Sequence, residues 1–225
     1  MISRNMHNIY EPFQRWFRPR RVRLLYRLFS ITPETIVLDL GGGAFFWDLA
    51  RTLGLAIPRI TVVNIRPAGA QTRPYLDWVI GDARRTTFEN FAFDLVFSNS
   101  LIEHLGTADS QEQFAREVRR LAPNYFIQTP DRQFPIEPHF VTPFVHWLPA
   151  PARRKAIRNF TVWGLRTRPS KEKCAELVQE IRLLSRPDMK KLFPDAGLAV
   201  ERFLGIPKSL IAYRVAPVLD RRTAA

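Results

Sequence analysis

Three consecutive glycines are the part of the sequence whose type and spacing most directly indicate chemistry. Gly41–Gly43 follow the apolar run Thr35–Leu40, which carries Asp39 just before its end. At a turn from a strand into a helix, glycine lets the backbone bend sharply and lets a ligand approach the main chain. Phe46 stands where a dinucleotide motif has its third glycine, and no Gly-Lys-Ser/Thr follows, so two common nucleotide-binding patterns are absent. A nucleoside ligand with a charged amino-acid tail fits what remains.

Two of the four histidines lie where a general base could act near neutral pH. His104 directly follows Glu103, and His139 ends the segment 134–139, in which prolines restrict the backbone around Glu137. His7 and His146 are better explained by packing. Glu103, Glu137 and His139 carry groups that suit a metal ion, but their spacing is not that of a strong metal motif, so we expect no metal site.

Strand-like and helix-like segments alternate from residue 35 onward, which predicts parallel βαβ units. The expected strands cover residues 35–40, 59–65, 78–80, 93–99 and 125–128, and the expected helices cover 44–53, 110–121, 171–184 and 187–192. Pro187 should break the last helical stretch. Two final strands, 201–204 and 209–215, are joined by too few residues for a parallel crossover and should be antiparallel. We therefore expect an α/β fold, a doubly wound and mostly parallel sheet of seven strands that ends in an antiparallel hairpin.

On these motifs the sequence resembles the class I S-adenosylmethionine-dependent methyltransferases. VLDLGGG at 37–43 matches their first motif, and FDLVFSNSLIEHL at 93–105 looks like the type 11 pattern, which also occurs in quinone-biosynthesis methyltransferases. The resemblance implies S-adenosyl-L-methionine as the cofactor and a Rossmann-like methyltransferase fold. Residues 34–220 are expected to form the methyltransferase domain. From composition we also expect a basic, aromatic helical segment over residues 1–33, and an acceptor-side insertion at 131–170, where the alternating pattern stops.

The resemblance also implies a set of cofactor-binding residues. Asp39 would orient the glycine loop and the cofactor's ammonium group. Asn64 takes the place of the acid that usually accepts from the ribose hydroxyls, and an amide lacks that charge. Asp82 would accept from the adenine amine, although taken alone it would be interpreted as a helix cap. The full expected set is Asp39, Gly41, Gly42, Gly43, Asn64, Ile65, Asp82, Ala83, Ser98 and Asn99.

Methyl transfer to a hydroxyl needs alignment, exclusion of water and a base. We predict His139, His104 and Glu103 as the catalytic residues. His139 would be the base or an acceptor-binding residue, and His104, beside the cofactor, is equally explained as a base or as a structural residue. The predicted acceptor is an oxygen of a small molecule, a glycan or a lipid-linked compound. Carbon methylation of a quinone-type acceptor is the alternative. The Asn/Asp-Pro-Pro-Tyr/Phe signature is absent after residue 99, and Cys174 lies far from the motifs, which disfavours two kinds of nucleic-acid methylation.

The chain carries 34 Lys and Arg against 21 Asp and Glu, a formal charge of +13. Residues 1–30 contribute seven bases and one acid, residues 150–191 contribute twelve bases and four acids, and the remainder is close to neutral. Aromatic residues interleave with both basic stretches, which is typical of an anionic membrane surface or of single-stranded nucleic acid, although solvated packing segments can look the same. We expect an anionic membrane surface as a second partner, with nucleic acid less favoured.

Further features limit the class of protein. The single cysteine, Cys174, excludes a disulfide framework and fits a small apolar residue on a helix. The sequence has no apolar run of the roughly 18 residues that a membrane span needs, and its start lacks a secretory pattern. We therefore expect a cytoplasmic enzyme, peripheral on the inner face of the membrane. A non-catalytic cofactor-binding partner protein is the remaining alternative, for which Asn64 is the hint.

Overall fold

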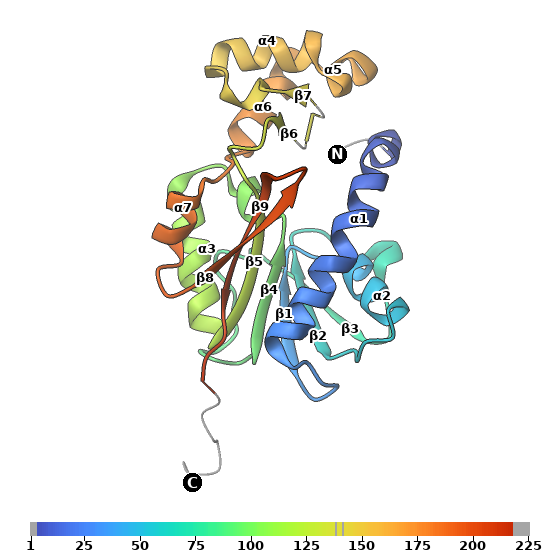
Figure 1. Ribbon diagram of the computed structural model, residues 1–225, viewed down its shortest axis with the longest axis vertical. Coiled ribbons are helices and arrows are strands. Elements are labelled where there is room, and N and C mark those ends of the chain that lie inside the picture. The colour runs from blue at the N-terminus through green and yellow to red at the C-terminus, as the bar shows by residue number, and fades with distance from the viewer. Residues whose placement is uncertain (1–3, 138, 141, 218–225) are drawn as a thin grey trace.

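The computed structural model describes residues 4–137, 139–140 and 142–217, with side chains from Trp16 onward. Within this part, seven strands form one sheet in the order β3-β2-β1-β4-β5-β9-β8 (Figure 1). The strands are β1 (Ile36–Leu40), β2 (Arg59–Asn64), β3 (Leu76–Ile80), β4 (Leu95–Asn99), β5 (Asn124–Pro130), β8 (Gly197–Phe203) and β9 (Ile206–Arg214). β1 to β5 are parallel, β9 is antiparallel to β5, and β8 is antiparallel to β9. The predicted α/β fold with an antiparallel C-terminal pair is confirmed.

Helices cover both faces of the sheet because side chains alternate along each strand. On β1, Val37 belongs to the core under α1 (Arg4–Phe29) and α2 (Ala44–Thr52), whereas Leu38 belongs to the core under α3 (Ala108–Leu121) and α7 (Arg186–Leu192). Both residues are fully buried. The sheet is therefore apolar on both sides, which explains why its strands are nearly continuous hydrophobic runs in the sequence.

Several predicted boundaries differ from the structure for local reasons. β5 does not stop before Thr129 but continues to Pro130, which pairs with Ser209 at the strand end. Pro187 does not break a helix. It lies in the first turn of α7, which begins with a capping box between Ser185 and Asp188, and a proline is well tolerated there. The preceding helix, α6 (Lys171–Glu180), ends well before it, so the predicted 171–184 helix is too long.

A small subdomain lies over the carboxyl ends of the parallel strands (Figure 1). We call residues 134–181 the cap. It contains the hairpin β6 (Ile136–Glu137) and β7 (Thr142–Pro143), the short 3-10 helix η3 (Val145–Trp147), and the helices α4 (Ala150–Phe160), α5 (Val162–Thr167) and α6. The cap has its own apolar core, formed by Phe140, Val145, Ile157, Trp163, Cys174 and Val178.

The cap is a continuous excursion from the sheet. The chain leaves at Asp131 and returns at Leu184, and these two residues form a β-bridge. The expected insertion at 131–170 lies within this excursion, but α6 also belongs to it because Cys174 and Val178 complete its core. Cys174 is buried on a helix, as predicted.

Two further points complete the fold. The described helices include none that is both long and apolar enough to cross a membrane. Pro138, in the predicted rigid segment before His139, and residue 220, the predicted end of the domain, lie outside the described residues, as do residues 1–3.

Candidate functional site

The glycine turn is a crowded backbone bend between β1 and α2. Gly41 has a φ of +75°, a conformation that favours glycine. A Cβ added at Gly42 would lie 2.1 Å from the Asp39 carboxylate oxygens, and one at Gly41 would lie 2.6 Å from the side chain of Leu101. The turn therefore leaves bare main chain beside a buried carboxylate, which is the surface that the resemblance predicts for the cofactor's amino-acid end.

Asp39 is fully buried directly beneath this turn. One carboxylate oxygen accepts a 2.9 Å hydrogen bond from the Trp47 indole, and the other, Oδ1, has no hydrogen-bond partner among the described residues. Burial raises the pKa of Asp39 to about 7, against the opposing effect of the Trp47 hydrogen bond. A carboxyl group in this state gains a great deal from a cationic ligand group placed against its free oxygen.

Asn64 makes hydrogen bonds that the sequence did not predict. Its amide Nδ2 donates to the carbonyl oxygens of Gly41 and Gly42, at 3.3 and 3.1 Å, and its Oδ1 accepts from the backbone of Arg66 at 3.1 Å. The side chain thus fixes the glycine turn from the end of β2. An aspartate could not donate these two bonds, so the amide is suited to this contact.

The other predicted cofactor residues differ in exposure and in how far contacts within the chain already occupy their side chains. Asp82 is held by the Arg84 guanidinium at 2.6 Å and accepts from the Arg84 backbone, and these contacts lower its pKa. It therefore closes a turn rather than capping a helix. Ser98 is fully buried and donates to the carbonyl of Leu40 at 2.9 Å, so its hydroxyl joins β4 to β1. Ile65 is exposed and Ala83 is buried.

Arg21 is a site residue that sequence reasoning did not single out. It lies on α1 with only 6% of its surface exposed, and it reaches the carboxyl edge of the sheet. Its guanidinium donates to Asn99 of β4, to Gln128 of β5 at 3.0 Å, and to Glu201 of β8. In the sequence it is one of seven arginines in a basic stretch, and nothing local distinguishes it.

The short 3-10 helix η2 (Ile102–Leu105) carries Glu103 and His104 directly after β4. It is held from two sides. Gln111 of α3 donates to the carbonyl of Ile102 at 2.9 Å, and the Arg182 backbone donates to the carbonyl of Glu103 at 2.8 Å. His104 also donates from its backbone to Leu101, the residue that contacts Gly41. Glu103 and His104 therefore lie within one helical turn of Leu101, whose side chain packs against the glycine loop.

Folding brings His139 of the cap onto η2. Its Nε2 lies 3.1 Å from Nε2 of His104, with the two rings nearly perpendicular. On the other side of the ring, Nδ1 lies 2.6 Å from the Glu137 carboxylate, whose second oxygen accepts from the Phe140 backbone at 2.7 Å. Glu137 thus fixes the orientation of the His139 imidazole. We call Glu103, His104, Glu137 and His139 the histidine–carboxylate cluster.

Glu103 is the most deeply placed member of this cluster. It is fully buried, and Oε2 accepts a 2.9 Å hydrogen bond from Thr129 of β5. Its other oxygen, Oε1, has no hydrogen-bond partner in the described part of the chain. Burial raises the pKa of Glu103. A ligand group from Glu103, one from His104 and one from His139 all lie within 4.8 Å of one another.

The two imidazoles of the cluster differ in their surroundings. Part of the His104 side chain is exposed, but the protein atoms packed around its ring remove water from it, and this desolvation together with the neighbouring His139 lowers the pKa of His104 to about 4. Burial also acts to lower the pKa of His139, but the Glu137 and Glu103 carboxylates outweigh it, and the pKa is raised overall. His139 is therefore the more basic ring of the pair, and His104 is the one held neutral.

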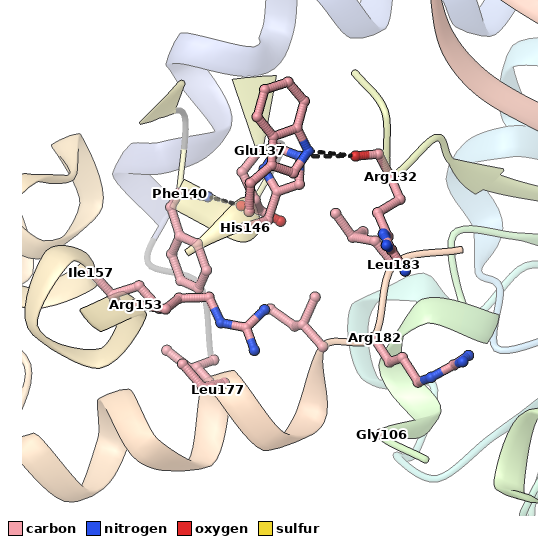
Figure 2. Close-up of a pocket in the computed structure, with 13 residues that line it drawn as sticks. Gly106, Arg132, Glu137, Phe140, His146, Arg153, Ile157, Leu177, Arg182 and Leu183 are labelled. Atoms are coloured by element: carbon pink, nitrogen blue, oxygen red, sulfur yellow. Dashed lines mark hydrogen bonds between the residues drawn. The ribbon is translucent and has the colours of Figure 1, made fainter. Parts of the chain in front are cut away.

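A cavity of about 500 Å³ lies between the cap and the loops that flank it, and Glu137 of the cluster is part of its lining (Figure 2). The arginines Arg132, Arg153 and Arg182 line it, together with Glu137 and His146. Arg153 has a buried Nε with no hydrogen-bond partner among the described residues, and burial lowers the pKa of its guanidinium. The cavity therefore presents positive charge to anything that enters it. The apolar part of its lining comes from Phe140, Trp147, Ile157, Leu177, Val178, Ile181 and Leu183.

Comparison with known proteins agrees with this geometry. Residues 38–124 match the type 11 family described as "Methyltransferase domain". No curated protein matches the sequence. The matched range contains every predicted cofactor residue together with Glu103 and His104, and it ends before the cap.

Solved structures with this fold have low sequence identity to the chain. The 1,6-didemethyltoxoflavin-N1-methyltransferase of Burkholderia thailandensis, solved with 1,6-didemethyltoxoflavin and S-adenosylhomocysteine, is 14% identical, with a TM-score of 0.53 over 91% of this chain and 81% of that one. The N-methyltransferase NodS from Bradyrhizobium japonicum WM9 is 16% identical, with a TM-score of 0.50 over 90% and 95%. A SAM-dependent methyltransferase from Methanosarcina mazei is 13% identical, with a TM-score of 0.50 over 86% and 98%.

The family match and the fold define a class I S-adenosylmethionine-dependent methyltransferase. Within that class, residues 38–124 are similar to the methyltransferase domain of the type 11 family. S-adenosylmethionine is its cofactor, and the residues present fit that molecule. The unpartnered Oδ1 of Asp39 suits the ammonium group, and the turn at Gly41 and Gly42 leaves the main chain uncovered for the rest of the amino-acid end.

Proposed function

We propose that the enzyme transfers the methyl group to a hydroxyl oxygen of a small-molecule, glycan or lipid-linked acceptor that carries an anionic group. The observation that carries this proposal is the position of the histidine–carboxylate cluster. Glu103 and His104 of the cluster follow the carboxyl end of β4, Glu137 and His139 lie in the cap hairpin that follows β5, and Glu137 also lines the arginine-rich cavity. In open α/β sheets this edge is where ligands bind.

The cofactor supplies a methyl group on a sulfonium, which an oxygen nucleophile can displace. The protein must then align the acceptor and remove the hydroxyl proton as the oxygen attacks. In the metal-free protein, His139 is suited to that task. Glu137 contacts Nδ1 of this imidazole, which leaves Nε2 on the side of the ring that faces His104. A carboxylate behind an imidazole also stabilises the ring once it takes a proton.

We infer the anionic group of the acceptor from the arginine residues that line the cavity. Arg132, Arg153 and Arg182 surround it, and a guanidinium pairs well with a carboxylate or phosphate. Arg182 already contacts Gln111 and lies 3.9 Å from Asp188, whereas the buried Nε of Arg153 lacks a partner among the described residues. Arg153 is therefore the arginine best placed to bind an incoming anion.

Nitrogen and carbon are the alternative acceptor atoms. The names of the Burkholderia and Bradyrhizobium neighbours specify nitrogen acceptors, and they share 14% and 16% identity with this chain. Carbon methylation of a quinone-type acceptor would also use a base at this position. The cluster supports oxygen because a hydroxyl must lose its proton in the transfer, whereas a neutral amine can attack before losing one.

The test is a turnover assay with hydroxyl acceptors that come in pairs, with and without a phosphate or carboxylate. S-adenosylhomocysteine formation gives the rate, and mass spectrometry with NMR identifies the methylated atom. We expect O-methylation, faster with the anionic member of a pair, and a loss of about 100-fold or more in kcat for His139→Ala. Unchanged turnover in His139→Ala, or a methyl group on carbon or nitrogen, would contradict the proposal.

A further inference from the structure

We propose that Glu103, His104 and His139 bind a divalent first-row transition-metal ion, with Glu137 as the outer partner that orients His139. The proposal departs from the sequence analysis, which expected no metal. The reason lies in the topology, because Glu103 and His104 follow β4 whereas His139 lies in the β6–β7 hairpin of the cap, which follows β5. β4 and β5 are parallel neighbours in the sheet, and the cap hairpin folds back over their carboxyl ends, so the three residues meet although 35 positions separate the two histidines.

The spacing of the ligand atoms suits a metal ion. Two nitrogens bound at about 2.05 Å with tetrahedral angles are separated by about 3.3 Å. The two histidine Nε2 atoms lie 3.1 Å apart, and ligand atoms of all three residues fall within 4.8 Å. Without an ion, the two facing nitrogens share at most a single hydrogen bond.

A second observation points to a ligand independently of the histidines. Glu103 is fully buried, yet its Oε1 has no hydrogen-bond partner among the described residues. A buried carboxylate oxygen without a partner is costly, and a cation held against it removes that cost. Arg21 is a fixed positive charge that acts on Glu103, but its guanidinium is already paired with Glu201.

The donor set indicates the kind of ion. Two imidazoles and one carboxylate are typical of zinc and of other first-row transition metals, whereas magnesium prefers oxygen ligands. Metal-bound histidines usually donate their other ring nitrogen to a carboxylate, and Glu137 accepts at 2.6 Å from His139 in this way. Three protein ligands leave room for an external oxygen, as in catalytic metal sites.

The inference deepens the proposed function because it concerns the same cluster. With an ion bound, His139 Nε2 is a ligand and no longer the base. The open coordination position would then suit the acceptor hydroxyl, which a bound cation would make acidic enough to lose its proton to solvent water before the oxygen attacks the methyl group. Binding of the ion can be measured without any acceptor, so failure of this proposal leaves methyl transfer untouched.

The test is equilibrium dialysis of the tag-free full-length protein against Zn²⁺, Mn²⁺ or Mg²⁺, followed by metal analysis. We expect one Zn²⁺ or Mn²⁺ per chain and no saturation by Mg²⁺ at millimolar concentration. His139→Ala and Glu103→Gln should abolish stoichiometric binding, and Glu137→Gln should weaken it about 10-fold to 100-fold. His146→Ala, a histidine outside the cluster, should bind as the wild type does.

Circular dichroism of each variant establishes that it is folded. Should Glu103→Gln fail to fold, the surface-proximal His104→Ala replaces it. Less than a fifth of an ion per chain, the same stoichiometry in wild type and cluster variants, or binding of Mg²⁺ alone would overturn the proposal. If the metal-stripped protein still transfers methyl groups while the cluster holds no ion, the result would agree with the proposed function and would count against a role of the ion in it.

Discussion

Arg21 of α1 donates a 3.0 Å hydrogen bond from Nε to Glu201 of β8, a residue 180 positions later in the chain. The same guanidinium contacts Asn99 and Gln128, so a single buried side chain links the N-terminal helix to β4, β5 and β8. Asn99 was predicted to face the cofactor, and its side-chain oxygen is held by this arginine.

Replacing Arg21 should therefore destabilise the protein strongly. Arg21→Met leaves Glu201 buried without its counter-charge, which costs about 3–5 kcal/mol in the free energy of unfolding, measured in urea. Arg21→Met combined with Glu201→Leu should recover part of that loss. Lys173→Met, which removes one partner of an exposed ion pair on α6, is the control and should leave the unfolding midpoint in place. Equal losses of stability in Arg21→Met and Lys173→Met would contradict a special role of Arg21 in holding the fold together.

Asp39 should make stability depend on pH. Its pKa in the folded protein is about 7, above its value in the unfolded chain. The stabilising contribution is therefore complete below the unfolded pKa and is lost as pH rises through about 7. A shift of about three pKa units corresponds to about 4 kcal/mol. Asp39→Asn should lose this dependence between pH 4 and pH 8, and identical pH profiles of urea unfolding for the two proteins would refute the prediction.

Cofactor binding should release a proton from Asp39. Near pH 6 the free carboxyl group is largely protonated, and an ammonium group against its unpartnered Oδ1 favours the charged form. Titration calorimetry with S-adenosylmethionine in two buffers of different ionisation enthalpy measures the released proton. We expect close to one proton near pH 6, fewer at pH 8, and none from this group in Asp39→Asn. An Asp39→Asn protein that releases as many protons as the wild type would rule out this residue as the source.

Asn64→Asp separates the observed role of this residue from the one that the family pattern implies. In the structure its amide donates to the carbonyls of Gly41 and Gly42, and a carboxylate would instead repel them. We expect about tenfold weaker binding of S-adenosylmethionine, which is about 1.4 kcal/mol. Tighter binding would mean that residue 64 turns to the ribose when the cofactor is present.

The arginine-lined cavity predicts a split between kinetic constants. Arg153→Ala should raise the KM for an anionic acceptor about tenfold or more, because a charge-assisted contact is lost, while the KM for S-adenosylmethionine stays unchanged. Arg154→Ala, its exposed neighbour on α4, is the matched control and should alter neither constant with a soluble acceptor. An equal rise in both KM values for Arg153→Ala would remove the cavity as the acceptor site.

The basic stretches predict docking on an anionic membrane surface. The start of α1 and the cap lie at the same end of the molecule's long axis (Figure 1). Aromatic residues there are exposed, with Phe160 at 76% and Trp147 at 53%. We expect recovery in flotation with vesicles that contain phosphatidylglycerol and not with phosphatidylcholine alone.

The matched variants for this experiment carry the same change of charge. Arg154→Glu with Lys155→Glu should abolish flotation, whereas Arg59→Glu with Arg116→Glu, on exposed positions away from the cap, should not. Equal recovery with both kinds of vesicle would count against the membrane. Binding of single-stranded nucleic acid with a steep salt dependence, and no flotation, would favour the other polyanion.

The sequence by itself determined the sheet, the glycine turn and the class of enzyme. These depend on local patterns, because a buried parallel strand is a continuous apolar run and a tight turn over a buried acid requires glycine. The segments before and after Gly41–Gly43 were placed to within a residue, and the antiparallel hairpin followed from the length of its connection.

Only the tertiary structure decided which polar groups meet. Arg21 and Glu201, or His104 and His139, are distant in the chain, and their partners depend on strand order and on how the cap folds back over the sheet. The hydrogen bonds of Ser98 and Asn64 could not be predicted from the sequence for the same reason. Both lie at strand ends where ligands are expected, yet Ser98 joins β4 to β1 and Asn64 holds the glycine turn. A side chain's position along the sequence fixes its strand and its face, whereas its hydrogen bonds depend on neighbours that only the folded chain supplies.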